Sequence, residues 1–325
     1  MSASRTITTR AFEVTDTQRL EEILRLNWGA KAGRSHYDAF FWTMADDPLP
    51  SGRTLVAELA GRVVGFGMIG QHEWHASAAM LGINVDPSFR RRGIGTALYE
   101  ALLETWTHLH GRRPVRAVAS EKHPDAARFL ERRGFSEDNR THLSMLEFAN
   151  IDEAAFQRVL ERLERRGISV HSFSSLGNDP DYESRAAALL GSVYTSAHSV
   201  NETSDGIPLE DWICELREFQ ADGVMIAIED GEYVGFGALA ESEKLTEPTG
   251  FFYGALESHA NLRLEISLAI VAMQMRYLQA RGVANLHFEV DSDDLHGMAL
   301  IAALPVTPQS AFVTYLRPLE TTRAQ

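Results

Sequence analysis

The sequence predicts an α+β fold that is built twice in tandem, and two observations support this prediction. The first is an internal repeat, because residues 56–67 recur 170 positions later at 226–237, with six identical residues and no gap. The second is the order of sequence patterns in each half: strand, helices, hairpin, strand, helix, strand, helix, strand. Such an order predicts two units, each a mixed, mostly antiparallel sheet flanked by helices.

Each element of the first half has its own sequence pattern. A long amphipathic helix has apolar residues at helical spacing: Ile94, Ala97, Leu98, Ala101, Leu102 and Trp106. A shorter helix starts at Pro124 and stops at Gly134, since proline favours the first helical position and glycine the end. The other elements expected here are a helix over 17–28, a hairpin turn at Ala60-Gly61, strands over 78–85 and 114–119, and a final strand over 141–148 that closes the unit.

The second half repeats this order. Its long helix has apolar residues at Leu264, Leu268, Val271, Met275 and Leu278. The other expected elements are a helix over 182–194, a hairpin turn at Asp230-Gly231, and strands over 251–256 and 284–290. A charged amphipathic helix over 151–167 joins the copies; because it lacks a Pro, Gly or Ser run, we expect it to be ordered. These elements predict an N-terminal domain (1–149), a connecting helix (150–167) and a C-terminal domain (168–325).

The composition is that of a globular protein. The 325 residues are 44% hydrophobic and 23% charged, which is enough apolar material for a substantial core. The first 16 residues lack the apolar core of a signal peptide, and no apolar run approaches the length of a membrane span. We therefore expect a cytoplasmic protein without a membrane partner.

Cysteine usage limits the chemistry. Cys214 is the only cysteine, so internal disulfides and multi-cysteine metal sites are excluded, and we expect no bound metal. A cysteine nucleophile stays open in principle. We expect instead that Cys214 is a buried small residue in a helical stretch over 212–219.

The charge is distributed unequally between the halves. Residues 1–150 have 19 Lys and Arg against 18 Asp and Glu, whereas residues 151–325 have 12 against 27. The total of −14 argues against a nucleic-acid partner. The acidic second half favours a cationic acceptor such as an amine or a basic peptide.

The strand-to-helix junction over 83–98 is the most informative stretch. Pro87 ends a strand, and a helix begins directly after a turn of three arginines and two glycines. Amides at a helix start are unpaired and favour anions, glycine leaves room for a phosphate, and arginine adds forked donors. We therefore predict phosphate binding there; the alternative is a solvated basic run. The predicted contacts are Arg90, Arg91, Arg92, Gly93, Ile94, Gly95 and Thr96.

This junction resembles the signature of the GNAT acyltransferase superfamily, [Gln/Arg]-x-x-Gly-x-[Gly/Ala] between a strand and a helix. A second family feature, a short helix that ends in Gly-Phe, resembles residues 123–135. The motif resemblance spans about residues 5–148. Over 168–319 it rests on the repeat and the element order, so the whole chain resembles a tandem GNAT protein.

The resemblance implies acetyl-CoA, or another acyl-CoA, as the donor. The amides of residues 91–95 would hold the pyrophosphate, and the strand backbone at Ile83, Asn84 and Val85 would lie along the pantetheine arm. His123 stands where the family usually has an asparagine that contacts this arm. Phe129, on the same short helix, joins these expected cofactor-binding residues.

The proton-transfer groups depart from the family pattern. Leu130 stands where the family often has the tyrosine that protonates the departing thiolate, and the strand before Val85 lacks its usual carboxylate. Candidate bases are Glu73, Glu121 and His123, directly or through water. Each has an alternative role, the two glutamates as solvated surface groups and the histidine as a helix cap.

The second half loses the phosphate motif. The 170-residue offset places Arg263 and Glu265 opposite Gly93 and Gly95. A carboxylate at a helix start competes for the amides and repels phosphate. Leu304-Pro305 also stands near the expected Gly-Phe, so we expect that the second unit does not bind CoA in the usual way.

These observations predict an N-acyltransferase in which the first domain moves an acyl group to an amine by direct attack in a ternary complex. The acceptor would lie between the units or against the aromatic stretch His36, Tyr37, Phe40, Phe41 and Trp42, which is equally compatible with core. A non-catalytic acyl-CoA sensor and a structural tandem protein remain alternatives. Either a monomer or a homodimer is compatible with the sequence.

Overall fold

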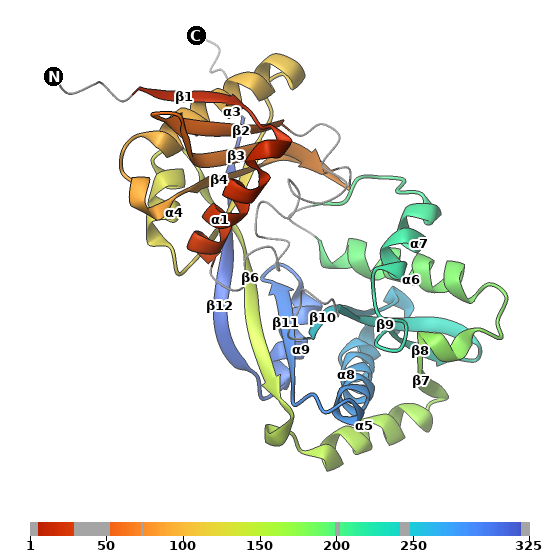
Figure 1. Cartoon of the computed structure of the whole chain (residues 1–325). Helices are drawn as coiled ribbons and strands as arrows, with labels where there is room; N and C mark the ends of the chain where they lie inside the picture. Colours follow the sequence, from red (N-terminus) through yellow and green to blue (C-terminus); the bar gives the residue numbers. More distant parts are fainter. Residues whose placement is uncertain (1–5, 29–52, 73, 199–201, 241–247, 320–325) are drawn as a thin grey trace, which may run out of the picture. The chain divides into compact units, whose positions relative to one another are not determined.

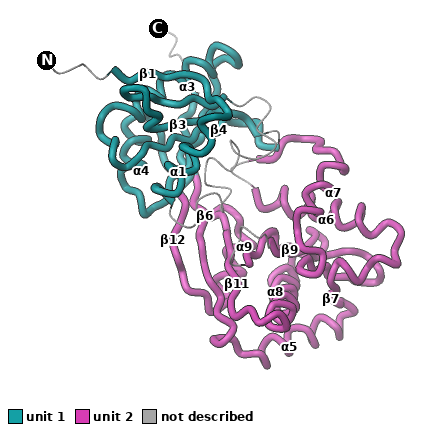
Figure 2. Tube along the Cα trace, viewed as in Figure 1, with its two compact units in different colours: residues 1–138, 313–325 teal, residues 139–312 magenta. Residues whose placement is uncertain are grey.

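A computed structural model describes residues 6–28, 53–72, 74–198, 202–240 and 248–319. The chain forms two compact units: unit 1 comprises Met1–Asp138 and Val313–Gln325, and unit 2 comprises Asn139–Phe312 (Figure 2). The end of the chain thus belongs to the same compact unit as its beginning. The domains predicted from the sequence, 1–149 and 168–325, are continuous because they follow the repeat. The units defined by spatial contacts differ, because unit 1 also includes the end of the chain.

Unit 1 has a mixed sheet. Four strands pair antiparallel in chain order, and the fifth runs parallel to the fourth. The end of β12 (Thr307–Arg317) follows the fifth strand in the sheet order. The five strands are β1 (Ile7–Ala11), β2 (Arg53–Leu59), β3 (Arg62–His72), β4 (His75–Val85) and β5 (Val115–Ser120).

Helices cover both faces of this sheet (Figure 1). On one face, α1 (Thr17–Trp28) packs against β3 and β4, with Leu20, Ile23 and Phe66 fully buried. On the other face, α3 (Ile94–His110) packs over β1–β4, and α4 (Pro124–Glu131) lies against β5. The segments around them include the short 3-10 helices η1 (Val14–Asp16) and η3 (Pro87–Phe89).

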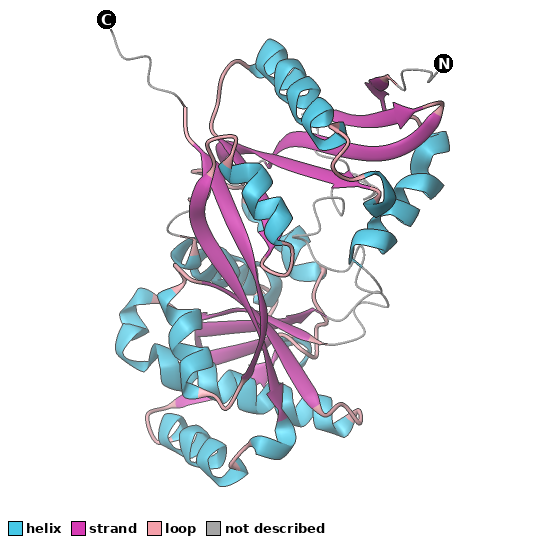
Figure 3. Ribbon diagram, turned by 90° about the vertical axis from the view of Figure 1, so that its left-hand side faces the viewer, coloured by secondary structure: helices cyan, strands magenta, loops and turns pink. Residues whose placement is uncertain are grey.

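Unit 2 repeats this arrangement (Figures 1 and 3). Strands β7 (Ile168–Ser172), β8 (Met225–Glu229), β9 (Glu232–Ala240) and β10 (Thr249–Ala255) pair antiparallel, and β11 (Asn285–Asp291) runs parallel to β10. The helices are α5 (Glu153–Glu164), α6 (Tyr182–Ala197), α7 (Leu209–Arg217), α8 (Arg263–Ala280) and α9 (Leu295–Ala303), and the 3-10 helices are η4 (Phe148–Asn150), η5 (Phe173–Leu176) and η6 (Glu257–Leu262). The predicted α+β fold, built twice, is confirmed.

Both predicted hairpin turns are confirmed. Ala60 and Gly61 have φ of 55° and 73°, and Asp230 and Gly231 have φ of 48° and 84°. Two consecutive residues with positive φ form the tight turn whose twist suits antiparallel strands, which explains why both copies retain glycine at the second position. The strand pairs Leu59↔Arg62 and Glu229↔Glu232 flank these turns.

The final strand of the first half has a different partner from the one expected. We predicted that 141–148 closes the first unit, but β6 (Ser136–Glu147) pairs antiparallel with β11, from Thr141↔Asp291 to Glu147↔Asn285. That expectation is wrong because alternation of apolar residues identifies a strand without encoding its neighbour. The two copies therefore exchange strands, since the end of β12 in turn belongs to unit 1.

Two expected core positions are also wrong. Cys214 is exposed. Helix α7 turns the buried side chains of Trp212 and Leu216 toward the rest of unit 2, and Cys214, which lies between them in sequence, is on the opposite side of the helix. Leu264 is 40% exposed at the first turn of α8, where Ile266 and Ile270 face the core instead.

Candidate functional site

The junction between β4 and α3 is a tight turn held by its own backbone and by Asp86. The Asp86 carboxylate accepts the Ser88 N–H at 2.9 Å and caps η3. Arg91 and Gly93 both have positive φ, 63° and 86°. At Gly93, which is the N-cap of α3, this left-handed conformation explains the glycine of the motif.

The start of α3 presents free backbone donors. The first bond closing the helix runs from the Ala97 N–H to the Gly93 carbonyl at 3.0 Å, so the N–H groups of Ile94, Gly95 and Thr96 precede the hydrogen-bonded ladder. The first turn has no acidic side chain, and the preceding arginines are exposed. The amides, the helix dipole and the guanidinium groups together favour an anion at this point.

Phe129 packs against the first turn of α3. A Cβ added at Gly95 would lie 3.3 Å from the Phe129 ring, so glycine permits this approach. The Arg133 guanidinium lies 3.6 Å from the centroid of that ring and donates to the Thr96 hydroxyl at 2.7 Å. The sequence analysis missed Arg133, which follows the end of α4; its spacing of four residues from Phe129 was the signal that could have found the contact.

Strands β4 and β5 separate beside this junction. Their parallel pairing covers Ala79↔Val115 to Leu81↔Ala117, while β4 continues to Val85 and β5 to Ser120. Two strand ends therefore lie next to each other beyond their last pair. An opening of this kind offers backbone groups to an extended ligand.

The polar backbone groups of β4 alternate in direction along this opening. The Asp86 N–H donates to the Val64 carbonyl of β3 at 2.9 Å. Because hydrogen-bonded and non-hydrogen-bonded positions alternate in an antiparallel ladder, the N–H and C=O groups of Ile83 and Val85 point away from β3, toward β5. This is the direction that a strand-like pantetheine contact requires, and the assignment of these residues stays a prediction.

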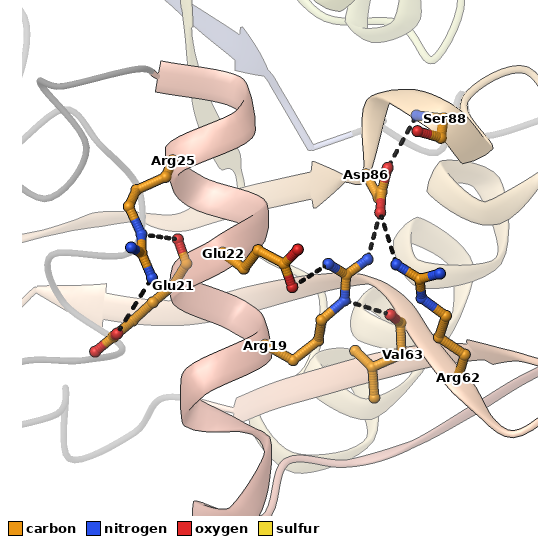
Figure 4. A network of polar contacts seen from close by, with 8 residues as sticks. All are labelled: Arg19, Glu21, Glu22, Arg25, Arg62, Val63, Asp86 and Ser88. Atoms are coloured by element: carbon orange, nitrogen blue, oxygen red, sulfur yellow. Dashed lines mark hydrogen bonds and ion pairs between the residues drawn. The ribbon is translucent and has the colours of Figure 1, made fainter.

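An arginine of α1 ties this junction to the rest of unit 1 (Figure 4). Arg19 bonds to the Asp86 carboxylate, whose side chain is only 3% exposed, and donates to the Val63 carbonyl at 3.0 Å. Burial by itself would raise the pKa of Asp86, but the Ser88 N–H and Arg19 outweigh it and lower that pKa. The capping carboxylate is therefore held ionised.

His123 lies on the α1 side of the opening. It is the N-cap residue of α4, and its ring meets the Trp28 ring edge-on, with centroids 6.2 Å apart. Burial, together with the charges of Arg90 and Lys122, lowers the pKa of His123. A neutral imidazole that can accept a proton therefore predominates at neutral pH.

The other predicted proton-transfer residues are less informative. Glu121 is exposed in the turn between β5 and α4. Leu130 is buried in the core of unit 1, and Glu73 and the aromatic stretch from His36 to Trp42 lie outside the described residues. His123, in contrast to the exposed Glu121, is partly buried.

The corresponding junction of unit 2 is occupied by its own side chains. Arg263, the first residue of α8, is 7% exposed and donates to the Ala255 carbonyl at the end of β10 at 3.2 Å. It also bonds to His296 in the first turn of α9 and to Glu257 at 2.8 Å. The pairing of β10 with β11 covers Thr249 and Gly250, so Arg263 bridges the region where these strands have separated.

Glu265 adds a carboxylate to the start of α8. Its carboxylate lies 3.4 Å from the guanidinium of Arg162 in α5 and 3.5 Å from that of Arg166, which follows this helix. The N-cap, Leu262, has a right-handed conformation, whereas its counterpart region in unit 1 has the left-handed Gly93. This junction therefore differs from that of unit 1 in backbone, charge and free space.

The described residues also limit the possible metal sites and membrane spans. Within the described ranges, no three His, Cys, Asp or Glu side chains group closely enough to hold a metal ion. No helix in those ranges is both long and apolar enough to span a bilayer.

Comparison with known proteins identifies the class. Residues 17–135, all in unit 1, match the acetyltransferase (GNAT) family. A protein named mycothiol acetyltransferase from Amycolatopsis mediterranei (strain U-32) is 25% identical over 316 residues, which cover 93% of this chain and 96% of that protein.

Two solved structures share the fold. A GCN5-related glucosamine N-acetyltransferase region of a fungal multi-domain GH3 β-N-acetylglucosaminidase has a TM-score of 0.70 and 14% identity, covering 97% of this chain and 38% of that one. A tandem GNAT protein from the clavulanic acid biosynthesis pathway has a TM-score of 0.65 and 16% identity, covering 96% and 98%.

Residues 17–135, which include the glycine-rich junction, match the GNAT acetyltransferase family, and the chain as a whole is similar to tandem GNAT proteins, as the resemblance implied. These likenesses support an acyltransferase of the GNAT type.

Proposed function

We propose that unit 1 transfers an acetyl group from acetyl-CoA to a small-molecule amine, and that unit 2 does not bind acyl-CoA. The observation that supports this most strongly is the contrast between the two junctions. Unit 1 combines a left-handed Gly93 with free amides, whereas Arg263 and Glu265 fill the same place in unit 2.

The donor fits unit 1 through its phosphates and its pantetheine arm. The pyrophosphate would accept from the amides of Ile94, Gly95 and Thr96, with Arg91 and Arg92 as charged donors. The pantetheine amides would pair with the backbone of Ile83 and Val85, which points toward the opening between the strands. This pairing would place the thioester beside His123 and the β4 backbone.

Chemistry would then be a direct transfer within a ternary complex. The amine nitrogen attacks the thioester carbonyl carbon and forms the new C–N bond, while a strand N–H stabilises the oxyanion. His123, kept neutral by its surroundings, accepts the amine proton directly or through one water. The C–S bond then breaks, and CoA leaves as a thiolate that takes a proton from water, since Leu130 replaces the usual acid.

The acceptor class follows from charge and from the relatives. The relative named mycothiol acetyltransferase supports a small molecule as acceptor. The net charge of −14 favours cationic molecules, because opposite charge raises their local concentration. A basic peptide meets the charge requirement as well and belongs in the first acceptor screen.

A second candidate function is acyl-CoA sensing without turnover. Leu130 in place of the acid favours it. Release of free CoA thiol in the presence of an amine panel separates these two functions, because a sensor binds acetyl-CoA and consumes none.

The experiment that tests the proposal is calorimetric titration of the full chain with acetyl-CoA, followed by the thiol-release assay. We expect one binding site per chain and amine-dependent turnover. Two sites per chain would contradict the assignment of unit 2, and no binding would contradict the function as a whole.

A further inference from the structure

A short hydrogen-bonded relay connects the arginine turn of unit 1 to the side chain of Asn84. Arg90 Nη2 donates to Asn27 Oδ1 at 2.6 Å, and Asn27 Nδ2 donates to Asn84 Oδ1 at 3.0 Å. Trp28 Nε1 donates to the same Asn84 oxygen at 3.2 Å. Asn84 itself is only 7% exposed.

The donors at both ends of the relay determine how each amide is oriented. Guanidinium and indole N–H groups can only donate, so the atom of Asn27 that faces Arg90 and the atom of Asn84 that faces Trp28 must be oxygens. The Oδ1 of Asn84 therefore has two donors. Its Nδ2 points the opposite way with two N–H groups, and no acceptor for them lies among the described residues.

The Asn84 side chain lies on the face of the sheet opposite to the one where acetyl-CoA would bind. Ile83 and Val85 pack in the cluster with Ile94 and Leu98, on the face covered by α3, where the pyrophosphate would bind. Side chains alternate along a strand, and the contacts of Asn84 with α1 confirm that it lies on the opposite face. His123 lies on this same side, because its ring meets Trp28.

We propose that the Asn84 amide binds an oxygen of the acceptor, next to the amine that His123 deprotonates. The two donors to Oδ1 fix the orientation of the Asn84 amide, so a ligand that covers its Nδ2 and supplies an oxygen to it is favoured over an otherwise equal ligand that covers it without one. The acceptor class is therefore an amine with a neighbouring hydroxyl or carbonyl oxygen, as in amino alcohols and amino sugars. This inference rests on the proposed function of unit 1.

The test uses two probes that differ only in that oxygen, trans-2-aminocyclohexanol and cyclohexylamine, with acetyl-CoA and the full chain. We expect the wild-type enzyme to prefer the amino alcohol by about tenfold in kcat/KM, from one hydrogen bond. Asn84→Asp keeps an oxygen for Asn27 and Trp28 but removes the N–H donor. This variant should therefore use the amino alcohol and cyclohexylamine with about equal kcat/KM. Trp28→Phe keeps the ring against His123 and removes one orienting donor, so an intermediate preference is expected.

The outcomes separate this inference from the proposed function. If Asn84→Asp turns over both probes with the wild-type preference, the inference is wrong and the function stands. A loss of acetyl-CoA affinity in Asn84→Asp, measured by calorimetry, would place the amide on the donor and also overturn the inference. Binding of acetyl-CoA without turnover of either probe or of a wider amine panel contradicts both.

Discussion

The two strand-to-helix junctions have the same place in a repeated fold and opposite chemical character. In unit 1 the helix starts at a left-handed glycine, with free amides and exposed arginines around it. In unit 2 the helix starts at a buried arginine that binds the carbonyl at the end of β10, with a glutamate in the first turn. The comparison teaches that the repeated fold keeps the strand and the helix without the two glycines, because unit 2 forms the same elements with Arg263 and Glu265 in their place.

The unit 2 junction also shows how a binding site can be replaced by internal contacts. Arg263 donates to a carbonyl, an imidazole and a carboxylate, which satisfies a buried guanidinium within the protein. The open junction of unit 1 instead leaves donors for a ligand. The following predictions test this contrast, beginning with the largest expected effect.

Transfer of the unit 2 residues into unit 1 should abolish donor binding. In the Gly93→Arg/Gly95→Glu variant, a side chain occupies a backbone with φ of +86° and a carboxylate faces the pyrophosphate. We expect acetyl-CoA affinity to fall by more than about 100-fold, which exceeds 2.7 kcal/mol. Calorimetry measures this, with Thr107→Glu, which adds a carboxylate at the far end of α3, as the control for the added glutamate. Wild-type affinity in a folded double variant would refute the site.

The arginine anchors of the two units should differ in their effect on stability. Arg19→Ala leaves the Asp86 carboxylate, 3% exposed, without its nearest guanidinium, and we expect a loss of about 3 kcal/mol in the free energy of unfolding. Arg185 of α6 in unit 2 bonds to Asp179, but that side chain is 27% exposed, so Arg185→Ala should cost less. Urea unfolding of both variants checks the order. Equal losses would contradict the difference in burial.

The proton acceptor should be found in one unit alone. His123→Ala removes the predicted base, and we expect kcat to fall by about 100-fold while acetyl-CoA affinity stays within threefold. His296 is the matched control, since it lies at the start of α9 but bonds to Arg263, and His296→Ala should keep wild-type kcat. Thiol-release kinetics measure both. Equal losses of kcat in the two variants would argue against unit 1 as the catalytic unit.

The smallest expected effect is on the pH profile. Burial and two nearby cations lower the pKa of His123 below 6.5, so the neutral base persists to lower pH, and kcat/KM should decline only as pH falls through that lowered value. Lys122→Gln removes one cation, which should raise the pKa and move the acid limb upward by less than one pH unit. Arg128→Gln, an exposed charge change on α4, should leave the limb in place. If the acid limb of the pH profile does not move in Lys122→Gln, a group other than His123 titrates there.

Much of the site was predictable from the sequence because its requirements are local. Gly93 is needed for a left-handed backbone, Gly95 for the approach of Phe129, and Pro124 for a helix start. The repeat predicted both hairpin turns, since each turn needs positive φ within two adjacent residues. Local conformational preferences of this kind are encoded in a few neighbouring side chains.

Contacts between distant residues could not be predicted from one sequence. In the relay from Arg90 through Asn27 to Asn84, the helix residue Asn27 is 57 residues from Asn84 and 63 from Arg90, and no pattern within the helix signals the strand or the turn. The stacking of Arg133 on Phe129 was missed because Arg133 lies in the turn after α4, and the spacing alone did not show how that turn meets α3.

The sequence by itself determined the α+β repeat, the glycine-rich junction of unit 1 and the loss of that motif in unit 2. Only the tertiary structure decided that β6 pairs with β11, that Arg263 fills the second junction and that Cys214 faces outward. The physical reason is the distance along the chain over which each interaction acts. Backbone preference and hydrophobic period act over a few residues, whereas strand pairing and side-chain partners depend on segments that meet only after folding.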